Sequence, residues 1–286
     1  MKNLRSKYQF IFGLLIVVAV VIGVSVFSRP QARGDLKVYF LNVGQGDASY
    51  IKMPNGEDVL IDGGPGSVVL DELGKVMDLT DREINLVILT HPHSDHLSGL
   101  IEVLKRYKVE EIWETGVEYP SAGYGQWKKL IAEKQIPDKF VQENEVKQFG
   151  LVKIYILYPL SSEKDKSVDN LNNASIVNRL EYGQFSVLFT GDAEKIVQNQ
   201  ISNENIYATI LKVPHHGSVN GLDEGFLKVV RPAVAVISVG EDNQFGHPAT
   251  STINLLKQYA VQIYRTDQNG TIGIYSDGKN YSISLF

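Results

Sequence analysis

The hydrophobic pattern divides the chain into an apolar N-terminal run and a longer body of mixed residues. Residues 10–27 carry no charge, and Ser25 is their one polar side chain, whereas basic residues stand before and after the run. As a helix rising ~1.5 Å per residue, this run would be about 27 Å long, close to the thickness of a bilayer's hydrocarbon core. Because the run is apolar all round, we predict a transmembrane anchor within residues 1–28 and a linker at residues 29–35.

The basic residues beside the anchor predict its topology. Lys2, Arg5 and Lys7 precede the apolar run and favour a cytoplasmic N-terminus with the body outside. The alternative is a signal peptide cleaved near residues 26–28, although the apolar region of a signal peptide is usually ~7–15 residues long. We therefore expect a single-pass protein of the cell membrane whose residues 36–286 are extracellular. Signal cleavage would instead give a secreted protein.

From residue 36 onward, short β-branched runs alternate with Gly and Asp turns, and apolar residues at helical spacing become frequent later. The predicted strands are Leu36–Leu41, Ser49–Ile51, Val59–Asp62, Leu86–Thr90, Val152–Tyr158, Ile176–Leu180, Phe185–Thr190, Thr209–Val213, Val234–Ser238, Gln262–Thr266, Thr271–Ser276 and Tyr281–Leu285. The predicted helices are Ser98–Lys108, Glu194–Ile201, Glu224–Val230 and Thr250–Tyr259. Strands in meanders, followed by strands that alternate with helices, predict an αββα sandwich of the α+β class.

Charge and composition limit what this body can bind. The first 33 residues hold five of the 28 basic residues and no acid, so the remainder holds 23 basic and 33 acidic residues, a net charge of −10. Clustered Lys and Arg supply the sequence-independent grip on nucleic-acid phosphates, and the body has no such excess. A phosphate held by metal ions stays compatible, because bound cations reverse the local charge. The chain has no cysteine, which excludes disulfides and thiolate metal sites.

The strongest chemical signal is a run of histidines and aspartate after an apolar strand. His91, His93, Asp95 and His96 form the sequence HPHSDH directly after the strand Leu86–Thr90. Side chains two residues apart in an extended segment point the same way, so His91 and His93 can hold one ion. Asp95 and His96 lie further along and can serve a second. Imidazole and carboxylate donors predict two divalent metal ions, Zn or Mn.

Later strand ends supply further candidates. Asp192 follows a Gly turn, where its carboxylate can bridge two ions, and the alternative is a helix N-cap ahead of residues 194–201. Adjacent side chains cannot point identically, so we expect one of His215 and His216 to bind metal, with a preference for His215, and the other to face substrate. His247, in a Gly-His-Pro turn, is assigned to contact substrate or to orient other groups. A second-site ligand, a proton donor and a structural histidine are its alternatives.

Three further residues are predicted to support the site. Asp47 and Asp62 are expected to orient metal-bound histidines through hydrogen bonds, with simple turn residues as the alternative. Asn173 is predicted to be a weak oxygen ligand or a hydrogen-bond donor to substrate, and turn chemistry is the alternative.

These motifs together resemble the metallo-β-lactamase superfamily, and their flanks are similar to the extracellular hydrolase domain of competence DNA-uptake proteins of the ComEC type. The matching segments are residues 42–48 (NVGQGDA), 60–64 (LIDGG), 91–96, 190–192 (TGD), 213–218 (VPHHGS) and 246–248 (GHP). The likeness runs from about Leu36 to Leu285 and implies an αββα fold, a two-metal site and hydrolytic activity. The separate third histidine of the superfamily is missing, and the corresponding region contains Asn172 and Asn173.

We therefore expect a metal-assisted hydrolase. A bound ion lowers the pKa of water from 15.7 to about 7, and the resulting hydroxide attacks phosphorus or a carbonyl carbon. Asp95 and Asp192 are expected to fix the ions and accept a proton, while a metal ion and His216 or His247 stabilise the developing charge. The resemblance favours a phosphoester substrate, with nucleic acid before a cell-surface phosphoester. The alternatives are a lactone, amide or thioester hydrolase and a non-catalytic metal-binding surface module. The sequence indicates no particular protein partner.

The predicted topology can be tested on intact cells. Added protease should degrade residues 36–286, because the basic residues before the anchor leave the body outside, and the intact body should fractionate with the membrane. Full protection of the body, or its complete release into the medium, would contradict this topology.

Overall fold

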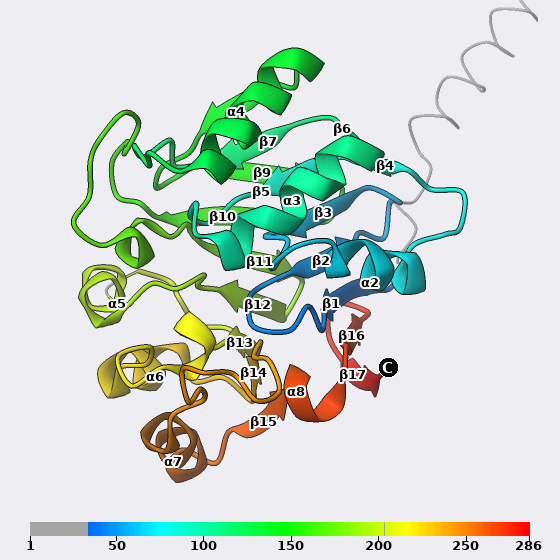
Figure 1. Cartoon of the computed structure of the whole chain (residues 1–286). Helices are drawn as coiled ribbons and strands as arrows, with labels where there is room; N and C mark the ends of the chain where they lie inside the picture. Colours follow the sequence, from blue (N-terminus) through cyan, green and yellow to red (C-terminus); the bar gives the residue numbers. More distant parts are fainter. Residues whose placement is uncertain (1–33, 203) are drawn as a thin grey trace, which may run out of the picture. The chain divides into compact units, whose positions relative to one another are not determined.

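The computed structural model describes residues 34–202 and 204–286. The predicted anchor within residues 1–28 and most of the predicted linker lie outside the described residues. Within the described part, no helix combines the length and the apolar character needed to cross a membrane. The body forms two facing sheets with helices on both outer faces (Figure 1), which confirms the predicted αββα sandwich.

The first sheet contains eight strands. They are β1 (Leu36–Phe40), β2 (Ser49–Lys52), β3 (Asp58–Ile61), β5 (Leu86–Ile88), β7 (Ile112–Glu114), β8 (Asp138–Phe140), β16 (Ile272–Ser276) and β17 (Tyr281–Leu285). Their order is β17-β16-β1-β2-β3-β5-β7-β8. The strands from β3 to β8 run parallel to one another, and the other neighbours are antiparallel.

The second sheet contains seven strands. They are β9 (Val146–Phe149), β10 (Val152–Tyr158), β11 (Val177–Tyr182), β12 (Phe185–Phe189), β13 (Ile210–Lys212), β14 (Val234–Ile237) and β15 (Gln262–Arg265), in the order β15-β14-β13-β12-β11-β10-β9. The strands from β12 to β15 are parallel. Two short strands, β4 (Glu83–Ile84) and β6 (Lys108–Val109), form a separate pair.

Three helices cover the outer face of each sheet. The first sheet carries α2 (Val68–Val76), α3 (Ser94–Arg106) and α4 (Ala122–Lys134), and the second carries α5 (Lys195–Ile201), α6 (Glu224–Val230) and α7 (Thr250–Gln258). A short helix, α8 (Thr266–Asn269), joins β15 to β16, and the 3-10 turns η1 (Leu171–Ala174) and η2 (Pro214–Gly217) lie in loops. Each helical layer buries one apolar stripe against its sheet.

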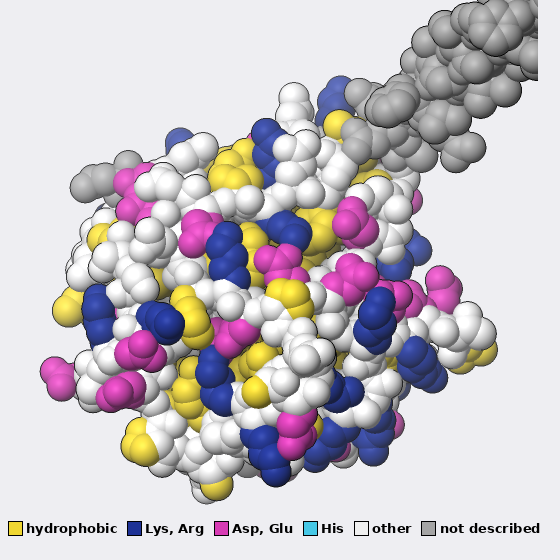
Figure 2. Space-filling model, turned by 90° about the horizontal axis from the view of Figure 1, so that it is seen from above, with side chains coloured by type: hydrophobic (Ala, Val, Ile, Leu, Met, Phe, Trp, Pro, Cys, Tyr) yellow, Lys and Arg dark blue, Asp and Glu magenta, His cyan; other side chains and the backbone are white. Residues whose placement is uncertain are grey.

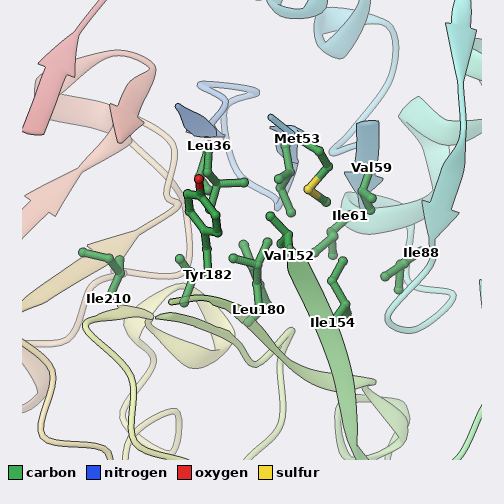
Figure 3. Close-up of a cluster of buried hydrophobic side chains, with 14 of the residues drawn as sticks. Leu36, Met53, Val59, Ile61, Ile88, Val152, Ile154, Leu180, Tyr182 and Ile210 are labelled. Carbon is green, nitrogen blue, oxygen red and sulfur yellow. The ribbon is translucent and has the colours of Figure 1, made fainter. Parts of the chain in front are cut away.

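The central core lies between the two sheets (Figure 3). Leu36, Ile61 and Ile88 of the first sheet and Ile154, Leu180 and Ile210 of the second belong to one buried cluster. Because inward-facing side chains alternate with outward-facing ones along a strand, the same strands also contact the helices on their outer faces. The sandwich therefore fixes both sheets relative to each other.

The parallel strands determine where polar side chains collect. Loops that follow β3, β5, β12 and β13 leave the carboxyl ends of parallel strands, and in open α/β sheets ligands bind outside these ends. The loop after β3 is held tightly against α3: Gly63 N donates to the His96 carbonyl at 2.8 Å, and Gly99 N donates to that of Gly64 at 2.9 Å. A Cβ at Gly99 would overlap the Gly63 carbonyl oxygen, so this close approach requires glycine.

The structure differs from the predicted elements in its helices. The predicted helix at residues 98–108 begins four residues earlier, at Ser94, where Asp95 in the first turn complements the helix dipole. Helices α2 and α4 were not predicted. Helix α4 contains Gly123 and Gly125, which have low helix propensity, but packing of Trp127 and Ile131 against the sheet outweighs that cost.

Candidate metal centre

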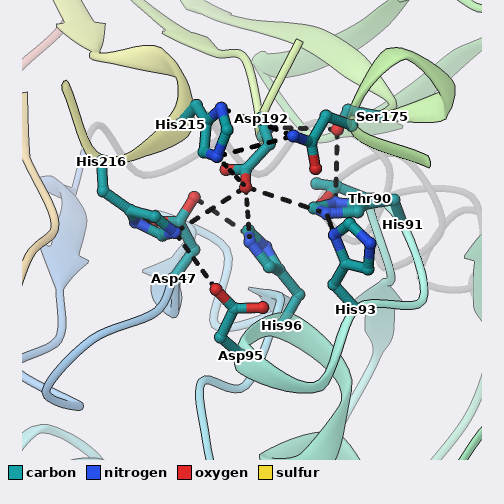
Figure 4. A network of polar contacts seen from close by, with 12 residues as sticks. Asp47, Thr90, His91, His93, Asp95, His96, Ser175, Asp192, His215 and His216 are labelled. Atoms are coloured by element: carbon teal, nitrogen blue, oxygen red, sulfur yellow. Dashed lines mark hydrogen bonds and ion pairs between the residues drawn. The ribbon is translucent and has the colours of Figure 1, made fainter. Parts of the chain in front are cut away.

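Six side chains from both sheets, with the carboxylate of Asp192 at their centre, form one cluster (Figure 4). His91, His93 and Asp95 follow β5 or begin α3, Asp192 follows β12, and His216 lies in η2 after β13. The sixth, His96, lies in the first turn of α3 and is fully buried. Residues more than a hundred positions apart thus meet at the edge where the parallel strands end.

The first donor group is formed by His91, His93 and Asp192. His91 Nε2 lies 3.0 Å from His93 Nδ1 and 3.8 Å from Asp192 Oδ2. The side of the His91 ring that faces away is held by two hydroxyls, since its Nδ1 lies 3.2 Å from Thr90 Oγ1 and 3.2 Å from Ser175 Oγ. These contacts orient Nε2 toward the centre, as an outer hydrogen-bond partner does for a metal-binding histidine.

The second donor group is formed by Asp95, His96, Asp192 and His216, whose ligand atoms all lie within 4.8 Å of one another. Asp192 Oδ2 lies 3.3 Å from His96 Nε2 and 3.7 Å from His216 Nε2. Asp95 Oδ2 lies 3.4 Å from His216 Nε2. Because Asp192 Oδ2 is close to donors of both groups, one carboxylate oxygen stands between two candidate ion sites.

Asp62 and Asp47 lie behind the histidines of the second group. Asp62 accepts from Thr90 N at 2.8 Å and Thr90 Oγ1 at 2.7 Å, and its Oδ2 lies 2.9 Å from His96 Nδ1. His216 Nδ1 donates to the Ser238 carbonyl at 2.9 Å and lies 3.3 Å from Asp47 Oδ1. Asp62 thus contacts His96 as predicted, whereas Asp47 Oδ1 has no hydrogen-bond partner and the ring of His216 is held by the Ser238 carbonyl instead.

The donor set fits divalent metal ions. Among the described residues, His96 Nε2, His216 Nε2 and Asp192 Oδ1 are buried without a hydrogen-bond partner. A buried polar atom left unpaired is costly, and here three such atoms belong to one cluster while the opposite ring nitrogens are satisfied. Imidazole nitrogen and carboxylate oxygen are the ligands that Zn and Mn accept.

The charges of the centre separate the histidines into two kinds. Burial lowers the pKa of His91 well below its usual value, so this ring is neutral and able to bind metal. Burial would also lower the pKa of His216, but the carboxylates of Asp192 and Asp47 raise it to about 10. The pKa of His96 is raised well above its usual value, because the charges of Asp192 and Asp62 outweigh burial. Metal binding must therefore displace protons from His96 and His216.

The preference for His215 as the ligand stays a prediction, and the structure places the two adjacent histidines differently. The structure brings His216, not His215, into the second donor group. Successive αL residues in η2, with φ of 49° at His215 and 53° at His216, turn the two rings to different sides. The ring of His215 lies next to Glu194, with Nδ1 3.5 Å from Glu194 Oε1, and its Nε2 is 3.9 Å from Asp192 Oδ2.

The side chains of Asn173 and its neighbour Asn172 have different contacts. Asn173 Oδ1 accepts from the backbone nitrogen of Glu194 at 3.2 Å, which is local turn chemistry. Asn172 Nδ2 lies 3.4 Å from His215 Nδ1, and Asn172 Oδ1 is buried without a hydrogen-bond partner. The N-cap of α5 is Glu194, so capping does not explain Asp192. Asp192 is oriented by Ser175, whose Oγ accepts from the Asp192 backbone nitrogen at 3.0 Å.

His247 lies beside both η2 histidines but outside the two donor groups. Its ring centroid is 5.8 Å from that of His215 and 6.5 Å from that of His216. Burial and the charge of His216 lower its pKa, so the ring is neutral. Contact of His247 with a substrate stays a prediction.

Lys212 is a site residue that the sequence prediction missed. Its ammonium group is buried, forms an ion pair with Asp47 Oδ2 and donates to the Gly191 carbonyl at 3.3 Å. Burial would raise the pKa of Asp47, but the charges of Lys212 and His216 lower it. A lysine within the apolar strand β13 was the available signal, because a buried lysine needs a partner. Ser175 and Glu194 carried no comparable signal.

Sequence comparison agrees with this geometry. The family model described as Metallo-beta-lactamase superfamily matches residues 41–241. ComE operon protein 3 of Bacillus subtilis is 29% identical over 270 residues, which cover 86% of this chain and 34% of that protein. Recombination protein 2 of Haemophilus influenzae is 28% identical, with 92% of this chain and 31% of that protein covered. The chain thus spans about a third of the length of these relatives.

Solved structures share the fold at low sequence identity. YhfI of Bacillus subtilis, a metallo-beta-lactamase fold protein, has a TM-score of 0.57 at 13% identity, covering 85% of this chain and 100% of that chain. Igni18, a metallo hydrolase of Ignicoccus hospitalis, has a TM-score of 0.53 at 16% identity, covering 83% and 98%. At these identities the similarity establishes the fold alone.

The Lys212 ion pair can be tested through stability. Lys212→Met should lower the free energy of unfolding of the metal-free protein by about 3–5 kcal/mol, because Asp47 stays buried without its ammonium partner. Urea denaturation followed by circular dichroism measures this change.

Two further variants complete the test. Lys228→Met, which removes an exposed ion pair with Glu224, should change the stability little. Adding Asp47→Asn to Lys212→Met should recover much of the lost stability, because the unpaired charge is gone. A Lys212→Met protein as stable as the wild type would show that the ion pair between Lys212 and Asp47 does not stabilise the fold.

Proposed function

Because this chain belongs to the metallo-beta-lactamase superfamily, we propose that its centre hydrolyses phosphodiesters with two divalent metal ions. Membership of that superfamily makes the chain a metal-dependent hydrolase, and the phosphodiester is our assignment. The observation that carries it is the position of Asp192 Oδ2 between two donor groups. Two adjacent ions clamp the attacking and leaving oxygens of an in-line displacement, which is the typical arrangement of phosphatases and nucleases.

The donor residues would hold the two metal ions as follows. His91 and His93 would hold one ion, Asp95, His96 and His216 the other, and Asp192 would contact both. When bound, the ions would supply hydroxide at neutral pH by lowering the pKa of water to about 7, and would neutralise charge on the phosphate oxygens.

Charge at the centre favours an anionic substrate over a neutral one. Asp47, Asp62, Asp95 and Asp192, counted as ionised, give −4, and Lys212 reduces this to −3. Two divalent ions would bring the centre to +1 before hydroxide binds. A phosphodiester anion whose oxygens contact the ions gains from their charge already in the ground state, whereas a neutral lactone or amide develops negative charge only as it reacts.

The attraction is local to the centre. On the face drawn in Figure 2, where no histidine side chain is visible, Lys and Arg side chains are interspersed with Asp and Glu. The net charge of −10 on residues 34–286 supports the same conclusion. A short segment of substrate at the metal centre fits these charges better than an extended duplex. The name of one relative, Recombination protein 2, supports nucleic acid as the first substrate class.

We assign the protonation of the leaving group to His215. Its ring is at the mouth of the centre, with a side chain 24% exposed, and the Glu194 carboxylate lies behind it at 3.5 Å. When the phosphorus–oxygen bond breaks, an alkoxide leaving group needs a proton, and a histidine oriented by a carboxylate can donate one. This role replaces the predicted one of His215 as ligand and is distinct from that of His216.

We also propose that residues 1–28 anchor the enzyme in the cell membrane with its body outside. This proposal rests on the apolar run at residues 10–27 and the basic residues before it. The substrate would then be an extracellular phosphodiester.

A panel of esters tests the proposed reaction. The full-length protein, loaded with Zn or Mn, should release p-nitrophenol from bis(p-nitrophenyl) phosphate and cleave thymidylyl-thymidine. A chelator should abolish both activities, and added metal should restore them. Turnover of a lactone or thioester panel without turnover of either phosphodiester would contradict the proposal.

The same panel tests His215. His215→Ala should slow the cleavage of thymidylyl-thymidine by about 10²–10⁴-fold, the usual contribution of a general acid. It should slow the cleavage of bis(p-nitrophenyl) phosphate much less, because p-nitrophenolate leaves without a proton. An equal loss on both esters would show that His215 does not act on the leaving group.

A further inference from the structure

Three aromatic rings follow one another outward from the metal centre. The rings of His216 and His247 are 6.5 Å apart with an angle of 28° between their planes, and those of His247 and Phe245 are 5.8 Å apart at 21°. His216 is buried, His247 is partly buried, and Phe245 is 59% exposed. The stack therefore begins at a candidate metal ligand and ends on an aromatic ring in contact with solvent.

The loop that carries Phe245 is fixed by its own hydrogen bonds. Asn243 Nδ2 donates to the Gly240 carbonyl at 3.0 Å and to the His247 carbonyl at 2.7 Å, and Asn243 Oδ1 accepts from His247 N at 2.9 Å. Ala249 N donates to the Gly217 carbonyl at 2.9 Å, which ties the loop to η2. The loop that carries Phe245 is thus held before any substrate binds, which reduces the entropy lost on binding.

Exposure alone does not distinguish Phe245, because single exposed hydrophobic side chains are common. Phe286 is almost as exposed, at 55%, but its ring meets Tyr39 edge-on at 5.9 Å beside the first sheet. Phe245 differs in its parallel stacking on His247 and in its place next to the centre. These two features point to a flat aromatic ligand.

We propose that Phe245, stacked on His247, binds the nucleobase next to the scissile phosphodiester, so that the enzyme acts on unpaired, single-stranded nucleic acid. The inference rests on the proposed phosphodiesterase function. A base in a duplex is already stacked on both faces, so it must be unpaired and splayed out to reach the ring.

Stacking also explains how an acidic body can bind a nucleic-acid strand. With a net charge of −10 on residues 34–286, clustered basic residues cannot supply most of the affinity for a strand. Stacking on an aromatic ring needs no positive charge and accepts every base. Removing such a ring typically lowers affinity by about 5- to 150-fold per base.

Two esters with the same leaving group isolate the contribution of the base. Thymidine 5′-(p-nitrophenyl phosphate) carries a nucleoside, and methyl p-nitrophenyl phosphate does not. In the metal-loaded wild type, we expect kcat/KM to be higher for the nucleoside ester. Phe245→Ala should reduce the ratio of the two values at least about fivefold, mainly through KM, and Phe245→Trp should preserve it. The control Phe286→Ala removes an equally exposed ring and should leave the ratio unchanged.

Binding gives a second readout that does not depend on turnover. Fluorescence anisotropy of a short fluorescein-labelled oligothymidylate should show weaker binding to Phe245→Ala than to wild type or Phe286→Ala, and annealing to the complementary strand should weaken binding to the wild type. An unchanged ester ratio and unchanged binding in Phe245→Ala would contradict the proposal that Phe245 binds a nucleobase. The proposed phosphodiesterase activity would not be affected by that result. Wild-type protein that cleaves neither ester would instead overturn the proposed function. The anisotropy measurement would still show whether Phe245 binds a nucleobase.

Discussion

The centre depends on the need to balance the buried carboxylate of Asp192. Burial opposes its negative charge, yet the cationic forms of His96 and His216 hold its pKa well below the usual value. The same histidines can exchange their protons for metal ions, so the site has two ways to satisfy one carboxylate. Gly191, which precedes Asp192, has a φ of 49°. A Cβ at this position would lie 3.0 Å from the side chains of Ser175 and Thr90, so the turn that positions Asp192 favours glycine.

The sandwich brings these groups together by a simple topological rule. His91 follows a parallel strand of the first sheet, and Asp192 and His216 follow parallel strands of the second. The αββα fold and this gathering could be predicted from strand patterns and the HPHSDH run, because strand ends and metal-binding spacing are local properties. Asp62 could be predicted to support the site because it ends a predicted strand close to the metal motif, although a simple turn residue was the alternative.

Other parts of the site depend on geometry that a sequence does not display. Two consecutive left-handed residues in η2 place His216, and not His215, in the compact donor group. Histidine adopts this conformation more often than most residues but only in a small minority of cases, so the sequence does not reveal it. Asn172 and Asn173 are the same residue type, and only the backbone of η1 determines which way each side chain points. Lys212 was overlooked because its partner, Asp47, lies 165 positions earlier in the chain. Helix α4 was missed because packing overrides its weak local propensity.

The claim that Asp192 joins two ions can be measured through metal content. Elemental analysis of the wild-type protein should find two divalent ions per chain, and Asp192→Ala should retain at most one while staying folded by circular dichroism. The matched control is Asp223→Ala, which removes the N-cap of α6, where Asp223 Oδ1 accepts from Phe226 N at 3.1 Å. Asp223→Ala should lower the free energy of unfolding by about 0.5–2 kcal/mol. The variant should keep both ions. A folded Asp192→Ala protein with two ions and normal hydrolysis would contradict the account.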